Sequence, residues 1–389
     1  MKLKNILTFL SFLYSIFISP QKKVNIIDFE TKKPIPQVRV VYNNQISYTN
    51  DDGFILLPNE EKYIEIFSPE YGQSIFAVNS IIELKAIYKE IEEIKIRSVD
   101  AKKIISSVLK DYNKNYETKA SIYNGILKSK SKINNMLNRI LVIDMDLWTL
   151  ANQYIYRKNI DDFIQINLRN KKFDKNRIED KTYIFNRKDN LNSQESQENN
   201  IKIFLQKFFL YNQLYFIDYY TKGLNIKGSI INETGDIQTI KFKTDKMPLN
   251  IICCEGIMQY NKKENTIIYM QCNQIQQKAI DKFLNIFDKE YTVSTDLFTV
   301  TYDMYKKEGK YIPAKIIMSY KANIMLENKE YPATRTDEFV FSTHSLSNRY
   351  GLSSKIDLNK NFLDSIFDNS IKDNKTLLSS EEQKFVDEQ

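Results

Sequence analysis

The feature that most constrains the fold of this chain is a series of short segments, between residues 224 and 343, in which apolar and polar side chains alternate. Residues 298–304 and 312–320 show the alternation most clearly. Successive side chains of a strand point to opposite faces, so this period predicts an antiparallel sheet with one packed and one solvated face. The expected strands are Leu224–Asn232, Ile237–Thr244, Ile251–Tyr260, Thr266–Cys272, Leu297–Lys306, Ile312–Tyr320 and Thr336–Phe341.

A helix is expected before this sheet, at Ser98–Tyr116, where apolar residues recur at i, i+3, i+4 and i+7. Asp100 or Ser98 can cap it by accepting a hydrogen bond from a free N–H group of the first turn. We expect its single apolar face to pack on the concave side of a curved sheet. A second helix is expected at Ile201–Tyr211. Further strand-like runs are Arg139–Leu147, Gln153–Arg157 and Phe163–Leu168.

Residues 24–97 show a different pattern, with shorter strands and more frequent turns. Proline occurs at positions 34 and 36, and the run Thr49–Gly53 is a tight-turn signal in which Gly53 takes a positive φ. Strands this short and frequent favour a small β-sandwich. The expected strands are Val38–Tyr42, Phe54–Leu57, Ile64–Phe67, Ile75–Val78, Ile81–Tyr88 and Ile91–Ile96.

The N-terminus has the pattern of an export signal. Lys2 and Lys4 precede an uncharged apolar run, Ile6–Ser19, which is too short for a comfortable membrane span. A buried first strand is the alternative. No later run is apolar enough over sufficient length to span a membrane, so we expect at most a peripheral membrane association. Export also disfavours nucleic acid as a partner.

Charge divides the chain near residue 98. Residues 24–97 carry 8 basic and 12 acidic side chains, a net of −4, whereas residues 98–190 carry 19 and 11, a net of +8. The basic part could face an anionic membrane or polymer, or it could be an ordinary solvated surface. The hydrophobic content of 42% excludes a chain that is disordered throughout.

The opening segment resembles the carboxypeptidase-like regulatory domain. The resemblance lies in VNIID at 24–28, T-x-x-P-I-P-x-V-x-V at 31–40, TNDDGF at 49–54 and LP at 57–58. It continues more weakly in residues 82–97, EGIMQY at 255–260 and GKYIP at 309–313, which resemble segments of Bacteroidota envelope proteins. Where that family has a glycine two residues after its first valine, this chain has Ile26. The resemblance implies a prealbumin-like Greek-key sandwich and a place in the envelope. It implies no chemistry, because these domains accompany catalytic or transport modules without being peptidases.

Two groups of reactive side chains were weighed for catalysis. His344, the sole histidine, is expected exposed at a strand end, because no nucleophile motif accompanies it. Cys253, Cys254 and Cys272 are too few for a disulfide framework. Cys272 could pair with either neighbour if two strands place them opposite each other; buried free thiols are the equal alternative.

Three polar or aromatic groups were weighed for binding or hydrolysis. Asn50, Asp51 and Asp52 resemble part of a calcium loop but lack its length and terminal glutamate, so a plain turn is expected. Asp144 and Asp146 share one strand face, and with Asp161 and Asp162 they could serve a glycosidase. The default interpretation of these acids is a solvated strand face without catalytic function. Trp148, Tyr154 and Tyr156 could stack on sugars, although core packing is commoner.

The sequence therefore predicts a mainly β protein with four parts: a signal peptide at 1–20, a regulatory-type β-sandwich at 24–97, a helix-plus-antiparallel-sheet domain at 98–345 and a poorly ordered tail at 346–389. We assign no catalytic, cofactor or metal residue. The function expected is a non-catalytic exported protein of the periplasm or outer-membrane periphery that binds an envelope protein, lipid or glycan. The alternatives are a hydrolase of an envelope polymer and a lipid or lipoprotein carrier that uses the curved sheet.

Overall fold

The computed structural model describes residues 21–87, 97–177, 187–190, 205–245, 247, 251–276, 280–285, 289–348, 351–358 and 377–388. The chain forms two compact units: unit 1 comprises Met1–Lys89 and Asn374–Gln383, and unit 2 comprises Glu90–Asp373 and Lys384–Gln389. The expected signal peptide at 1–20 and the expected strand at Ile91–Ile96 lie outside the described residues.

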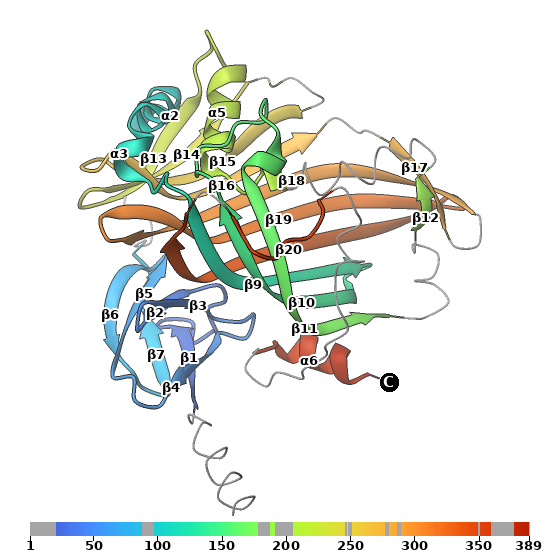
Figure 1. Cartoon of the computed structure of the whole chain (residues 1–389), viewed down its shortest axis with the longest axis horizontal. Helices are drawn as coiled ribbons and strands as arrows, with labels where there is room; N and C mark the ends of the chain where they lie inside the picture. Colours follow the sequence, from blue (N-terminus) through green and yellow to red (C-terminus); the bar gives the residue numbers. More distant parts are fainter. Residues whose placement is uncertain are drawn as a thin grey trace, which may run out of the picture. The chain divides into compact units, whose positions relative to one another are not determined.

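Unit 1 is a β-sandwich of two small sheets (Figure 1). One sheet has the order β4-β1-β7, in which β1 pairs antiparallel with β4 and parallel with β7; the other has the order β3-β2-β5-β6. Both sheets contribute every second residue to one apolar core. The strands are β1 (Gln21–Asp28), β2 (Arg39–Tyr42), β3 (Gln45–Tyr48), β4 (Phe54–Pro58), β5 (Tyr63–Ser68), β6 (Gly72–Ala77) and β7 (Ile81–Leu84).

The turn before β4 has the conformation expected from its sequence. Gly53 has φ +74° and its N–H bonds to the Asn50 carbonyl. The Asn50 side-chain oxygen also accepts hydrogen bonds from the backbone N–H groups of Asp52 and Phe54. A Cβ on Gly53 would lie 2.7 Å from the Ile26 carbonyl oxygen, so close packing as well as backbone conformation requires glycine here.

Unit 2 is built on a 13-stranded sheet in which neighbouring strands pair antiparallel. Its main path is β11-β10-β9-β20-β19-β18-β16-β15-β14-β13-β8; off this path, β17 pairs with β18 and β12 pairs with β17. The strands are β8 (Arg97–Asp100), β9 (Ser121–Ile133), β10 (Met136–Thr149), β11 (Ile164–Asn176), β12 (Arg187–Asn190), β13 (Lys227–Thr234), β14 (Ile237–Lys243), β15 (Ile251–Asn261), β16 (Thr266–Gln276), β17 (Ile280–Asn285), β18 (Glu290–Lys307), β19 (Lys310–Leu326) and β20 (Lys329–Leu346).

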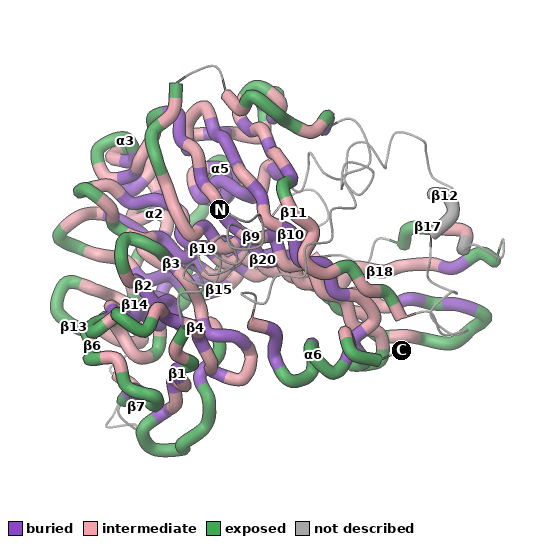
Figure 2. Tube along the Cα trace, turned by 60° about the horizontal axis from the view of Figure 1, so that its bottom comes forward, coloured by how far each residue is buried: buried purple, intermediate pink, exposed green. Residues whose placement is uncertain are grey.

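Helices cover one face of this sheet, which we call the core face. Helices α2 (Ala101–Lys110), α3 (Tyr112–Asn115) and α5 (Leu210–Tyr220) contribute to one large core together with alternate residues of the strands (Figure 1). Buried residues concentrate between these helices and the sheet, whereas the part of the sheet near β17 carries mostly half-buried and exposed residues (Figure 2). The core face is therefore filled mainly by helices and aromatic side chains.

The expected mainly β class, with antiparallel sheets and few helices, is confirmed. Of the two expected cap candidates, Asp100 caps α2 by accepting a hydrogen bond from the Lys103 N–H at 3.1 Å, whereas Ser98 lies two residues before this cap, within β8. The expected strand at Gln153–Arg157 is wrong, because this segment is a loop that leads into the 3-10 helix η1 (Ile160–Asp162). Its alternation arose from two aromatic side chains: the Tyr154 ring packs on Phe163 and Phe209, and the Tyr156 ring packs on α5.

The second expected helix, at 201–211, is confirmed in part. Residues 201–204 lie outside the described part, Leu205 and Gln206 are helical, and residues 207–209 are not. A helix that was not expected, α5, follows over Leu210–Tyr220. Strand β9 was not expected at all, because its second half is a run of lysine and serine. It exists because it pairs on both sides, with β10 and with β20.

The expected domain limits also differ from the compact units. The expected limit was 97/98, whereas the compact units divide at 89/90, and β8 pairs with β13 in the large sheet of unit 2. The segment expected to be a poorly ordered tail contains helix α6 (Ser380–Asp387). This helix begins with a capping box, in which the Glu382 carboxylate accepts a hydrogen bond from the Ser379 N–H and the Ser379 hydroxyl accepts one from the Glu382 N–H.

Candidate functional site

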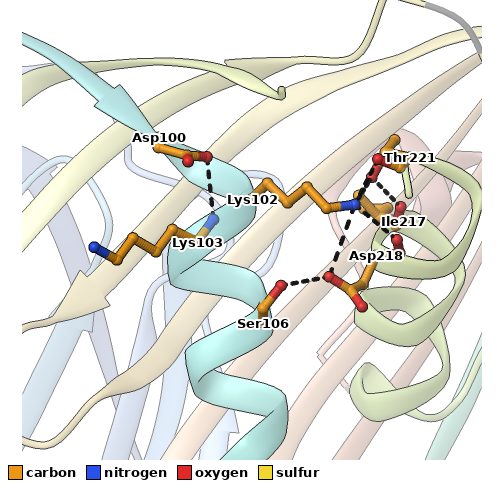
Figure 3. A network of polar contacts seen from close by, with 7 residues as sticks. All are labelled: Asp100, Lys102, Lys103, Ser106, Ile217, Asp218 and Thr221. Atoms are coloured by element: carbon orange, nitrogen blue, oxygen red, sulfur yellow. Dashed lines mark hydrogen bonds and ion pairs between the residues drawn. The ribbon is translucent and has the colours of Figure 1, made fainter. Parts of the chain in front are cut away.

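Helix α5 is held in place by a lysine of α2 (Figure 3). The Lys102 ammonium donates hydrogen bonds to the Asp218 carbonyl at 2.9 Å, the Thr221 carbonyl at 2.5 Å and the Thr221 hydroxyl at 2.9 Å. The Ser106 hydroxyl donates to the Asp218 carboxylate at 2.5 Å. A cation at these carbonyls satisfies groups that a helix C-terminus leaves unpaired, so Lys102 fixes the end of α5.

A buried asparagine joins α5 to the loop before η1. The side-chain oxygen of Asn212 accepts a hydrogen bond from the Tyr156 N–H at 2.7 Å, and its amide donates to the Gln206 carbonyl at 2.9 Å. Asn212 is only 5% exposed. A buried amide with both ends paired orients its neighbours strongly, so the loop that carries Tyr156 is fixed against α5.

Side chains of α5 and this loop together form a cluster of aromatic rings, which we call the tyrosine surface. Along α5 the rings of Tyr211, Tyr215 and Tyr219 are nearly parallel, with centroids 6.5 and 5.9 Å apart and interplanar angles of 13° and 18°. Tyr156 joins them through a 3.1 Å hydrogen bond between its hydroxyl and that of Tyr220. These rings are half-buried, and Tyr219 is 40% exposed. The surface consists of Tyr156, Arg157, Tyr211, Tyr215, Tyr219 and Tyr220.

An arginine completes the tyrosine surface. The guanidinium carbon of Arg157 lies 4.3 Å from the ring centroid of Tyr219 and 5.7 Å from that of Tyr156. Hydrogen bonds to these two tyrosines raise the pKa of the Arg157 guanidinium. The side chain is exposed, so a fixed positive charge stands among the rings and in contact with solvent.

Of the three aromatic residues considered for sugar stacking, one belongs to this surface. Trp148 is 3% exposed and Tyr154 is fully buried, so both serve the core. Tyr156 alone lies on the tyrosine surface. The four tyrosines of α5 were missed as binding residues, although the spacing of four residues between Tyr211, Tyr215 and Tyr219 is a visible signal for an aromatic stripe on a helix.

His344 is half-buried rather than exposed, which corrects the expectation. Its Nε2 lies 3.1 Å from the Ser121 hydroxyl, and its ring centroid lies 4.9 Å from that of Tyr123. Burial, together with the nearby Lys307 charge, lowers the pKa of the His344 imidazole. Ser121 is fully buried, so this histidine–serine contact offers no open site to a substrate.

The cysteines are three buried free thiols, the second of the two alternatives. The register places Gln274 opposite Cys254 and Gly256 opposite Cys272, so Cys254 and Cys272 lie diagonally across β15 and β16, while Cys253 points to the other face. A hydrogen bond between the two core thiols, and then burial, raises the pKa of the Cys272 thiol. Burial has the opposite effect on the ammonium of Lys207, which lies close to these thiols: it lowers the pKa of this group.

Of the four acids considered for hydrolysis, two share one strand face, as expected, and two lie elsewhere. Asp144 and Asp146 lie on β10 opposite to its core residues, and each pairs with a cation, Lys172 at 3.1 Å and Arg169 at 3.2 Å. Asp161 and Asp162 belong to η1. A small cavity on the core face, lined by Tyr112, Phe208, Tyr302 and Tyr311 among others, has a volume of about 10 Å³ and includes none of the four acids. Such a volume holds about one water.

The calcium-like turn makes contacts within unit 1. The Asp52 carboxylate accepts hydrogen bonds from the backbone N–H and the hydroxyl of Ser380, at 2.6 and 2.7 Å. The Asn50 amide donates to the Leu378 carbonyl at 3.0 Å. An acid at the first residue of α6 compensates the N–H groups that a helix start leaves unpaired. Among the described residues, no group of three or more histidine, cysteine or acidic side chains could hold a metal ion.

Comparison with known proteins gives no relative: no family model, no curated protein and no solved structure matches the chain. In the part of the chain that the structure describes, no helix is both long and apolar enough to cross a membrane.

Proposed function

We propose that this chain is a non-catalytic protein of the cell envelope that binds a polysaccharide through the tyrosine surface. The observation that carries the proposal is the row of nearly parallel rings of Tyr211, Tyr215 and Tyr219 beside Tyr156. Each tyrosine offers an apolar ring face that can stack on the C–H face of a sugar and a hydroxyl that can hydrogen-bond to the sugar.

The rigidity of the surface supports this role. The rings stand on a helix whose C-terminus is fixed by Lys102, and Asn212 fixes the adjoining loop. A ligand that stacks on the rings therefore immobilises few additional side chains, which reduces the entropic cost of binding. Tyrosine is suited to such a surface because only two side-chain torsions have to be ordered.

The envelope location rests on the sequence. The basic and then apolar start of the chain has the pattern of an export signal, and residues 24–58 resemble the carboxypeptidase-like regulatory domain. Both support an exported protein of the periplasm or outer-membrane periphery.

Two alternative functions have less support. A lipid carrier needs an apolar groove on the core face, whereas this face is packed with helices and aromatic side chains, and the cavity lined by Tyr112 and Tyr302 has room for about one water. A hydrolase that uses Asp144 and Asp146 needs both acids in a pocket, whereas each is paired with a cation on the face of β10 opposite the core.

The test is a binding screen of the full chain against neutral and acidic envelope polysaccharides, followed by titration. We expect the double variant Tyr215→Ala/Tyr219→Ala to weaken binding about tenfold or more, since two stacking contacts are lost. Alanine is the best helix former, so α5 should persist. The matched control is Tyr63→Ala, which removes a tyrosine that is 65% exposed in unit 1 and should bind normally. Equal binding by wild type and the double variant would refute the proposal.

A further inference from the structure

Arg157 forms no ion pair with a described acid, unlike five other arginines of unit 2. These five ion pairs are Arg97 with Glu233, Arg139 with Asp174, Arg169 with Asp146, Arg177 with Glu388 and Arg335 with Asp337. Within the described ranges, Arg157 contacts only Tyr156 and Tyr219. The acids next along the chain, Asp161 and Asp162, are not among the groups that shift its pKa.

The aromatic contacts hold the guanidinium without neutralising it. A guanidinium that lies over a ring is oriented by stacking and by the attraction of the cation to the ring face. It has five N–H donors, of which the two tyrosine hydroxyls can use only a part. The remaining donors are in reach of solvent, because the side chain is exposed. The charge is thus positioned in advance for an anion.

The neighbourhood adds positive charge. Lys158 follows Arg157 directly, and Lys222 follows the C-terminal residue of α5 by two positions; both are exposed. The half-buried acid of this helix, Asp218, is already engaged with Ser106 and lies 4.0 Å from the Lys102 ammonium. A ligand on the tyrosine surface therefore meets parallel rings together with cations for which no ion pair with a described acid is seen.

We infer that the polysaccharide bound at the tyrosine surface is acidic, and that Arg157 binds its carboxylate, sulfate or phosphate group while the rings of Tyr215 and Tyr219 stack on the sugars. This inference rests on the function proposed above. A planar guanidinium can form two parallel hydrogen bonds to a carboxylate, a geometry that the point charge of lysine does not provide.

The experiment titrates the full chain with alginate, pectate and hyaluronate, each beside a counterpart whose carboxyl groups have been reduced to alcohols. We expect at least one acidic form to bind roughly 10- to 100-fold more tightly than its reduced form, because a hydrogen bond to a charged group is lost on reduction. The preference should shrink as salt is raised. In Arg157→Gln the two forms should bind alike, and in Arg157→Lys part of the preference should remain.

The outcomes separate the two proposals. If wild type binds acidic and reduced forms equally, or if Arg157→Gln keeps the preference, the acidic-ligand inference is overturned while glycan binding stands. If neither form of any polysaccharide binds, both fall. If poly-glutamate or vesicles that contain an anionic phospholipid bind as tightly as the best acidic polysaccharide, in a manner that Arg157→Gln abolishes, the ligand is not a glycan and the inference is likewise overturned. Tyr219→Ala should weaken binding of both the acidic and the reduced forms, since it removes a stacking ring.

Discussion

The ammonium of Lys102 bonds to both the carbonyl and the hydroxyl oxygen of Thr221, 119 residues later in the chain. The contact joins the first turn of α2 to the residue at which α5 ends. Through this contact a helix that is identifiable from the sequence fixes α5, a helix that was not expected over Leu210–Tyr220. The tyrosine surface depends on this contact, because four of its rings stand on α5.

Replacing Lys102 by methionine should destabilise unit 2. The variant keeps the length of the side chain but loses hydrogen bonds from a charged donor, which together are worth about 2 kcal/mol. Urea unfolding can be followed by the fluorescence of Trp148, the sole tryptophan, which is buried in unit 2. The control is Lys103→Met on the same helix, where the side chain is exposed and points away from α5 (Figure 3). Equal unfolding midpoints for both variants would contradict the role of Lys102.

Gly53→Ala should destabilise unit 1 more than Gly72→Ala. Both glycines have φ +74°, so the backbone strain is the same, about 1–2 kcal/mol. A Cβ on Gly53 would also lie 2.7 Å from the Ile26 carbonyl oxygen, whereas a Cβ on Gly72 meets its nearest atom at 3.6 Å. Hydrogen exchange measured on peptides from β1 and β4 reports the opening free energy. The clash argument fails if the two variants exchange at the same rate.

Stability should fall as the pH is lowered from about 7 towards 5. Burial lowers the pKa of His344 in the folded chain, so the unfolded chain, with a histidine pKa of about 6.5, takes up the proton more readily. Stability is therefore full above the unfolded pKa and is lost as the pH falls towards the folded pKa. Since His344 is the sole histidine, His344→Gln should flatten this part of the profile.

The titration of His344 can also be observed directly. A single imidazole C–H signal should move with a midpoint below 6.5 in the folded protein and near 6.5 in urea. A folded midpoint above 6.5 would show that the imidazole is stabilised in its charged form and would reverse the expected pH trend.

The three thiols should be slow to react in the folded protein. Hydrogen bonding and burial raise the pKa of Cys272, and burial raises that of Cys253, so few thiolates form near neutral pH. We expect a disulfide reagent to modify no thiol within minutes under native conditions and three after denaturation. A single thiol in the denatured, unreduced protein would mean that two of the three cysteines had formed a disulfide, contrary to the free thiols of the structure.

Local signals in the sequence determined much of the fold. The alternation in residues 298–304 became part of β18, the Asp100 cap began α2, and the turn at Gly53 has the positive φ that its sequence required. These features depend on residues within a few positions of each other, and side-chain period, capping and backbone sterics are local effects.

Tertiary structure alone decided the pairings and the candidate site. Strand β9 is stable because β10 and β20 flank it, and β20 lies more than 200 residues away. The tyrosine surface joins Tyr156 and Arg157 to Tyr219 across some sixty residues through the buried amide of Asn212. The composition of a segment and the period of its apolar side chains predict which of its faces is apolar. They do not predict which distant segment will cover that face. The sequence therefore could not predict that Arg157 lies among tyrosines and forms no ion pair with a described carboxylate; only the tertiary structure shows this.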